Sequence, residues 1–187
     1  LAPDADPGLL ARLFPRYVGN RTLLLYVAAV VLAGFLALGL GCRPLAQLFS
    51  VSLVAWLVIS IAAEFLWLET LSGDCTDSMA STVNFSVIFL FGGGIAVWVI
   101  ALSVLAATRF IQKRDWFKSV FGLGQIAVTA LCAAFVFRLL HPDPMEVGSL
   151  REPLTLLAML AAAGVYFFVN TGLVAGAVSL ERRQPLP

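Results

Sequence analysis

Few side chains in this sequence could do chemistry, and the most unusual of them lie inside long apolar stretches. One is the carboxylate of Glu64, and the others are amide and hydroxyl side chains in three further stretches, namely Asn84, Gln125, Thr129, Asn170 and Thr171. Polar groups at such positions cost free energy unless they are paired or functional. They are therefore the candidates for binding a ligand or for joining helices.

Each of these polar groups has two interpretations. Glu64 is either a proton-linked or ligand-sensing carboxylate that faces the interior of a helix bundle, or an interfacial glutamate that reaches water. The nearby Glu69 favours the interfacial interpretation, because it places the end of the apolar stretch close by. The amide and hydroxyl side chains either hold helices together, at about 0.6–2 kcal/mol for each hydrogen bond, or converge on a cavity for a small polar ligand. Cohesion of the bundle is the simpler interpretation.

The residue types that usually carry catalysis are scarce. The only histidine, His141, precedes a proline and is expected in a loop, and the three cysteines lie in separate segments, at Cys42, Cys75 and Cys132. No Ser/His/Asp or Cys/His arrangement, paired-cysteine motif or glycine-rich phosphate loop can be assembled from them. We therefore predict that the chain is not an enzyme and has no catalytic residue, metal site or cofactor.

Composition points to lipid as the solvent of this chain. Hydrophobic residues make up 60% of it and charged residues 12%, whereas soluble domains carry about 25% charged residues. A net charge of +1 argues against nucleic-acid binding, which requires a basic face.

Charge-free stretches recur five times along the chain. Because lipid cannot satisfy exposed backbone groups, such stretches enter a bilayer as helices of roughly 17–25 residues. We predict an all-α, polytopic membrane bundle with five transmembrane helices, at residues 22–42, 44–68, 78–108, 117–140 and 153–180. Residues 1–21 would form a tail or an interfacial helix, and residues 181–187 a cytoplasmic end.

Glycines mark two places of expected close packing or bending. Gly92, Gly93 and Gly94 interrupt the third predicted helix. If they form the apex of a hairpin, the chain has six segments, but each half has only about 14 residues and is short for a bilayer. We therefore prefer one tilted or kinked helix. Gly172 and Gly176 form a GxxxG spacing in the last helix, which suits a close crossing with another helix of the same chain.

The distribution of basic residues bears on the number of crossings. Cytoplasmic loops collect Lys and Arg, so the segment 109–118 and the C-terminal end are expected inside the cell. Five crossings then place Arg12, Arg16 and Arg21 outside, against the rule. Six crossings place nine of the 12 basic residues inside, all except Arg43, Arg138 and Arg151. Helix length favours five crossings and charge favours six.

The order of features resembles a bacterial membrane module that precedes HD-type phosphohydrolase or diguanylate cyclase domains. The matching parts are the acidic end of the second helix with its loop (64–77), the glycine-interrupted helix (81–105), the basic and aromatic approach to Gln125 (115–125) and the last helix around Asn170 (166–183). That module has a glycine–proline pair where this chain has Gly92–Gly94. The resemblance implies a sensory or anchoring role and supplies no catalytic residue.

Three functions follow from these observations. The first is a non-catalytic sensory, anchoring or accessory module in the bacterial inner membrane, with the lipid bilayer and other membrane subunits or a cytoplasmic signalling domain as partners. The second is a small-solute binding or transport subunit, similar in size to the substrate-binding membrane components of vitamin uptake systems. It predicts a polar cavity between the last three helices. The third is an accessory subunit of a larger membrane complex.

Overall fold

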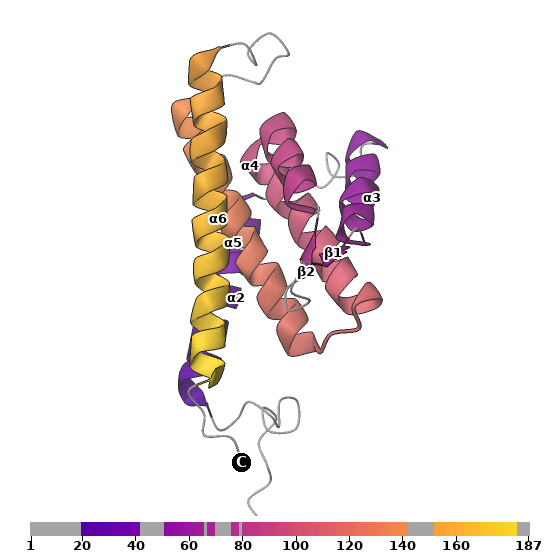
Figure 1. The fold of residues 1–187 in the computed structure, drawn as a ribbon, viewed down its shortest axis with the longest axis vertical. Coiled ribbons are helices and arrows are strands. Elements are labelled where there is room, and N and C mark those ends of the chain that lie inside the picture. Colours follow the sequence, from indigo (N-terminus) through magenta and orange to yellow (C-terminus); the bar gives the residue numbers. More distant parts are fainter. Residues whose placement is uncertain are drawn as a thin grey trace, which may run out of the picture.

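The computed structural model describes residues 20–41, 51–65, 67–69, 76–78, 80–141 and 152–182. Within these ranges the chain is almost entirely helical, and the helices form one elongated bundle (Figure 1). The predicted fold class, an all-α bundle with helices suited to a membrane, is confirmed. The expected tail or interfacial helix before residue 20, the residues after 182, Cys42 and Cys75 lie outside the described residues.

The first and last described helices meet at one end of the bundle. Helix α2 spans Arg21–Leu40, and its N-cap residue Asn20 accepts a hydrogen bond from the backbone N–H of Leu23 at 3.0 Å. The amide nitrogen of Asn20 also donates to the carbonyl oxygen of Leu180, at 2.7 Å. Leu180 lies near the end of α6, which spans Pro153–Arg182. The start of α2 and the end of α6 therefore lie side by side.

Helix α5 (Trp116–Leu140) is the centre of the bundle. Both α2 and α6 pack against it, and so does α4. In an apolar stretch of 18 residues, 56% of α5 is buried, against 17% of the corresponding stretch of α6. The buried core is rich in alanine and β-branched residues, which let helices approach closely; it includes Val87, Ile88, Ala96, Val97, Ile100, Ala127 and Ala130.

Helix α4 (Ala80–Ala106) is broken in the middle. Gly92 has φ 71° and ψ 176°, which is far from helical geometry. A positive φ of this size suits glycine, because it has no Cβ atom to clash with the backbone. Beyond Ala106 the chain continues in a π-helical turn, η2 (Ala107–Ile111), before α5 begins.

Side-chain contacts show the direction of the half of α4 that precedes the break. Asn84 contacts Tyr166, which lies about midway along α6. One turn later, Phe89 packs against Phe137 near the far end of α5, with ring centroids 4.8 Å apart. This half therefore runs from the middle of the bundle toward the end at which α5 stops.

The half of α4 after the break runs the other way. Gly93 still lies beside Ala134, near the far end of α5, but Val104 lies beside Gly122, close to where α5 begins. The chain therefore turns back at Gly92. This arrangement corresponds to a hairpin apex at the glycine triplet. It corrects the preferred prediction of one tilted or kinked helix, because the two halves of α4 run in opposite directions.

The predicted count of five transmembrane helices is not confirmed. Among the described residues, four helices are long and apolar enough to cross a membrane by length and composition alone: α2, α4 together with η2, α5 and α6. Because the chain turns back at Gly92, α4 and η2 do not form one straight helix. Helix α3 (Val51–Phe65) has 15 residues, or about 22 Å, which is less than the ~30 Å of hydrocarbon. Five full crossings would also place Asn20 and Leu180 at opposite ends, and the structure places them together.

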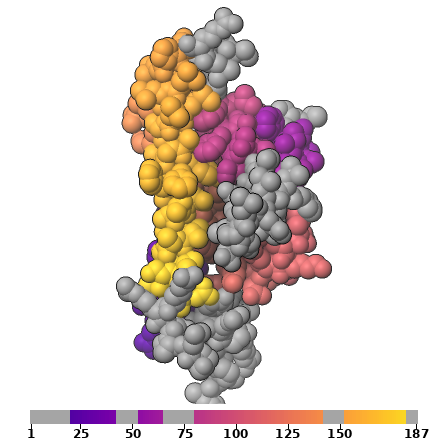
Figure 2. Space-filling model, in the orientation of Figure 1, coloured from indigo at the N-terminus to yellow at the C-terminus, as the bar shows by residue number. Residues whose placement is uncertain are grey.

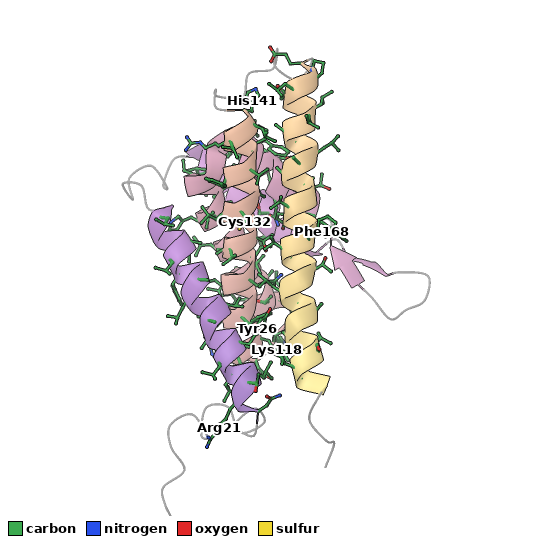
Figure 3. All side chains as sticks on the ribbon, turned by 90° about the vertical axis from the view of Figure 1, so that its left-hand side faces the viewer. Arg21, Tyr26, Lys118, Cys132, His141 and Phe168 are labelled. Atoms are coloured by element: carbon green, nitrogen blue, oxygen red, sulfur yellow. The ribbon has the colours of Figure 1, made fainter. Side chains whose placement is uncertain are left out.

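Two three-residue strands were not expected. Strand β1 (Trp67–Glu69) pairs antiparallel with β2 (Thr76–Ser78), with Leu68 opposite Asp77. The sequence predicts helices that include residues 67, 68 and 78, and those helix boundaries are corrected. The ribbon lies beside the middle of the bundle (Figures 1 and 3). Pairing the two strands satisfies backbone groups that a bilayer leaves unsatisfied.

Large apolar side chains cover the outside of the bundle. Leu32 on α2 is 65% exposed and Phe168 on α6 is 74% exposed, and Phe168 points away from the other helices in Figure 3. Figure 2 shows α6 as an uninterrupted column along one side of the molecule. Exposed apolar surface on this scale suits lipid and not water. With four helices able to cross a bilayer, the chain is a multi-pass membrane protein.

Candidate functional site

Two hydrogen-bonded pairs form a polar layer inside the bundle. The amide nitrogen of Asn84 donates to the hydroxyl of Tyr166 at 3.1 Å, and the amide nitrogen of Gln125 donates to the amide oxygen of Asn170. Tyr166 and Asn170 are one turn apart on α6, so they share a face of that helix. The layer therefore joins α4, α5 and α6 at the same level.

The two threonines of the predicted polar set have other surroundings. Thr129 is fully buried, and its hydroxyl donates to the backbone carbonyl of Gln125 within α5, at 2.9 Å. Thr171 follows Asn170 on α6 but is exposed on the outside of the bundle. Of the six predicted residues, the structure thus brings Asn84, Gln125 and Asn170 into the polar layer and excludes Thr171.

Glu64 lies beside the same layer. It is the penultimate residue of α3 and is half-buried. Its carboxylate is within electrostatic range of the buried Tyr166, and it lines the same cavity as Gln125. Its position next to interior polar groups suits the interpretation of a carboxylate that faces the bundle interior.

Tyr166 was not singled out from the sequence. It is 5% exposed and connects the amide of Asn84 with the charge of Glu64. Its spacing could have pointed to it, because a tyrosine four residues before Asn170 lies on the same helix face. Tyr166 stands in a run of aromatic residues, however, and nothing in the sequence separates it from side chains that only pack.

A cavity of about 420 Å³ lies between the polar layer and the end of the bundle at which α5 begins. Five elements contribute to its wall, because α2, the end of α3, the end of α4 with η2, α5 and α6 all border it. Its size is within the range of about 300–1,000 Å³ typical of small-molecule sites. It is lined by Leu23, Val27, Glu64, Val104, Thr108, Gln112, Arg114, Phe117, Lys118, Phe121, Gly122, Gln125, Val174, Ala177, Val178 and Glu181.

The rim of the cavity is charged. Arg114, Lys118 and Glu181 are exposed there, and Figure 3 shows Lys118 toward the same end of the bundle as Arg21. The amide oxygen of Gln112 also lies at the cavity; it is buried and has no hydrogen-bond partner among the described residues.

The inner end of the cavity is polar, and none of the described residues there is basic. Gln125 lies about two turns along α5 from Lys118, so rim and floor are about 10 Å apart along that helix. Valine and phenylalanine side chains line the wall between them, including Val27, Phe121 and Val178. An apolar passage thus connects a charged rim with a polar floor, and this arrangement suits a small molecule that has both apolar and polar parts.

The glycine triplet and the GxxxG glycines have different roles. Gly92 supplies the positive φ of the break, whereas Gly93 lies against Ala134 and Gly94 against the end of α2, where a Cβ atom on Gly41 would be 2.9 Å from the Gly94 carbonyl oxygen. Gly176 contacts the ring of Tyr26, whose hydroxyl donates to the Leu173 carbonyl oxygen. Gly172 is exposed, and a Cβ atom at this position would meet no described neighbour within 4 Å, so only Gly176 of the GxxxG spacing takes part in a close contact.

The residues with potential for catalysis or metal binding lie apart. Among the described residues, no group of three or more His, Cys, Asp or Glu side chains lies close enough to hold a metal ion. His141 is buried at the end of α5, where it stacks on Phe137. Cys132 is half-buried in the middle of α5 and is not part of the cavity wall.

Fold and cavity together define a class, namely a polytopic helical membrane protein with a half-open amphipathic cavity between its helices. Comparisons of the chain with protein-family models, with curated proteins and with solved structures found no match. The resemblance to a sensory module therefore stays a hypothesis.

Proposed function

We propose that this chain is a non-catalytic membrane module that binds one small amphiphilic molecule in the cavity between α2, α3, α4, α5 and α6. In this role it serves as a sensory or accessory module for a partner or a downstream domain. Uptake of the ligand as a transported solute is the alternative, and it uses the same cavity.

The observation that carries the proposal is the cavity itself. A bundle that only anchored a partner would be expected to have a solid core, because protein interiors are close-packed. Here a space of about 420 Å³ adjoins a polar layer in the apolar part of the chain. Its apolar wall and few convergent polar groups are typical of ligand sites.

We further propose that the rim of the cavity faces the cytoplasm. Arg21, Arg114 and Lys118 lie at this end of the bundle, and Arg109 is held there over the ring of Trp116 at 4.9 Å. Basic residues collect on the cytoplasmic side of membrane proteins. The ligand would then enter from the cytoplasm or from the inner leaflet.

The exposed apolar face of α6 is accounted for by lipid. It provides no specific support for a partner subunit, so no contact among the described residues favours the accessory-subunit hypothesis. The ligand-binding proposal, in contrast, can be tested on the isolated chain.

The test is native mass spectrometry of the chain extracted from its membrane in a mild detergent. We expect one retained small molecule per chain. Ala177→Phe places a ring at the cavity wall and should abolish retention, whereas Ala175→Phe, on the exposed face of the same helix, should preserve it. Equal retention by both variants, or an empty wild-type chain, would contradict the proposal.

A further inference from the structure

We infer that the ligand carries an anionic head group, which Arg114 and Lys118 bind at the rim of the cavity, and that its alkyl chain extends inward toward Gln125. This inference rests on the proposed function and adds the chemical class of the ligand and its orientation. It follows from the order in which charged, apolar and polar side chains line the cavity wall.

The first step is the face that α5 turns toward the cavity. Residues at helical spacing line the wall along this helix, namely Lys118, Phe121, Gly122 and Gln125. Positions three, four and seven residues apart lie on one face of a helix. This face therefore changes from a positive charge in the first turn of α5 to an apolar stretch, and then to an amide.

The second step concerns the cations at the rim. Arg114 and Lys118 are the basic residues of the wall, and both side chains are exposed. Among the described residues, neither forms an ion pair with Glu181 or with another carboxylate. Lys118 also lies in the first turn of α5, where the end of the helix adds a partial positive charge. Both cations are therefore available to an anion in the cavity mouth.

The acidic residues near the rim do not outweigh these cations. Glu181 is the single carboxylate of the described wall at the rim, and Asp115, the N-cap residue of α5, is not part of the wall. The segment 109–118 contains four basic residues and one acidic residue. Gln112 carries N–H donors in addition to its buried oxygen. The rim as a whole is therefore positive, as in the basic pockets between helices that bind anionic lipid head groups.

The third step concerns the polar groups at the floor, which already have partners. The amide nitrogen of Gln125 donates to Asn170, and Glu64 also takes part in an interaction of its own. A polar head group at the floor would have to compete with these contacts, whereas the end of an alkyl chain needs no hydrogen bond. The anionic head is therefore placed at the rim and the alkyl chain at the inner end.

The wall between rim and floor limits the remainder of the ligand. Val27, Phe121 and Val178 are apolar, so the part of the ligand next to the head group should be a hydrocarbon chain. A volume of about 420 Å³ is near the lower end of the range for small-molecule sites, which favours one chain over two. With its head at the rim, the ligand has the orientation of the lipids on that side of the bilayer, so it can enter without turning over.

The test uses four probes with the same alkyl chain, namely octanoate, octyl phosphate, octanol and octylamine. Their affinities for the wild-type chain in a neutral detergent are measured by isothermal titration calorimetry at neutral pH and low salt. We expect both anionic probes to bind at least threefold more tightly than octanol, and octylamine to bind most weakly. The tighter of the two anionic probes shows whether the head group is a carboxylate or a phosphate. Ala177→Phe should abolish binding of all four probes.

The Lys118→Gln variant isolates the charge at the rim. We expect it to weaken binding of the anionic probes about three- to fivefold, a modest effect because the side chain is exposed. Lys113→Gln is the matched control, since it removes the same charge from an exposed residue outside the cavity wall, and it should change these affinities less than 1.5-fold. Octanol affinity should be unchanged in both variants, which also shows that they are folded. Added salt should reduce the preference for the anionic probes, because it screens exposed charges.

The outcomes separate the inference from the proposed function. Octanol bound as tightly as both anionic probes, tightest binding by octylamine, or equal effects of Lys118→Gln and Lys113→Gln would overturn the anionic assignment. So would a molecule without an acidic group retained in native mass spectrometry. If Ala177→Phe still abolishes binding or retention in those cases, the cavity remains a ligand site. Absence of binding by all four probes together with an empty chain in native mass spectrometry would overturn both.

Discussion

At the scale of single residues, the pair of Gln125 and Asn170 shows how a polar side chain is accommodated in the bundle. Each amide supplies a partner that the lipid does not provide. Because the pair is partly buried, loss of one member leaves the other with an unsatisfied group. Such groups cost about 1–3 kcal/mol in protein interiors.

We predict that Asn170→Leu lowers the free energy of unfolding by about 1–2 kcal/mol, within the range measured for interhelical hydrogen bonds in membranes. Thr171→Leu is the matched control, since Thr171 is its exposed neighbour, and it should change stability by less than about 0.5 kcal/mol. Reversible thermal or denaturant unfolding in detergent measures both. Equal effects of the two substitutions would show that the pair contributes nothing specific.

At the scale of elements, the crossing of α2 over α5 depends on glycine. Gly34 and Gly124 face each other across the two helices, and a Cβ atom on Gly124 would lie 2.9 Å from the Cα atom of Val31 and 3.0 Å from the carbonyl oxygen of Val30. Both neighbours are backbone atoms, so relief would require the helices to move apart. This close approach lets α2 contribute Leu23 and Val27 to the cavity wall.

We therefore predict that Gly124→Ala destabilises the protein by about 1–3 kcal/mol, the usual cost of overpacking. Gly172→Ala should have no effect or stabilise by up to about 1 kcal/mol, because Gly172 has open space around it and alanine favours a helix. The same substitution is therefore expected to lower stability at Gly124 and not at Gly172, and this difference makes the comparison sensitive. Destabilisation by both variants to the same extent would contradict the close crossing.

At the scale of the whole molecule, the reversal at Gly92 decides which ends of the helices lie together. It allows Arg21, Asp115 and the end of α6 to share one side of the membrane, with Glu152 at the opposite side. Five full crossings would instead place Arg21 on the same side as Glu152.

Labelling of single cysteines from each side of intact membrane vesicles tests this topology. In a chain whose native cysteines are replaced by alanine, we expect Arg21→Cys and Asp115→Cys to react from the same side, and Glu152→Cys from the other. The residues chosen are exposed at the ends of their helices. If Arg21→Cys and Glu152→Cys react from the same side, the result would contradict this topology and support five crossings.

The sequence alone predicted the helical membrane bundle, because charge-free stretches of bilayer length have only one way to satisfy their backbone in lipid. It also singled out Asn84, Gln125 and Asn170 as polar groups within apolar stretches, since polar residues stand out against apolar surroundings. For Glu64 it favoured an interfacial position, and the structure places this residue beside the polar layer. At the glycine triplet it favoured one tilted or kinked helix over a hairpin, because each half is short for a bilayer and kinks, close crossings and hairpins all favour glycine.

Tertiary structure alone decided three further features. The turn at Gly92 depends on where each half of α4 packs. The two short strands depend on backbone pairing between segments that mix polar and apolar residues. The partners of the polar groups, Tyr166 among them, depend on the rotation and axial position of each helix, which hydropathy leaves free. For the same reason, residues of five elements meet around one cavity only when those elements are packed together.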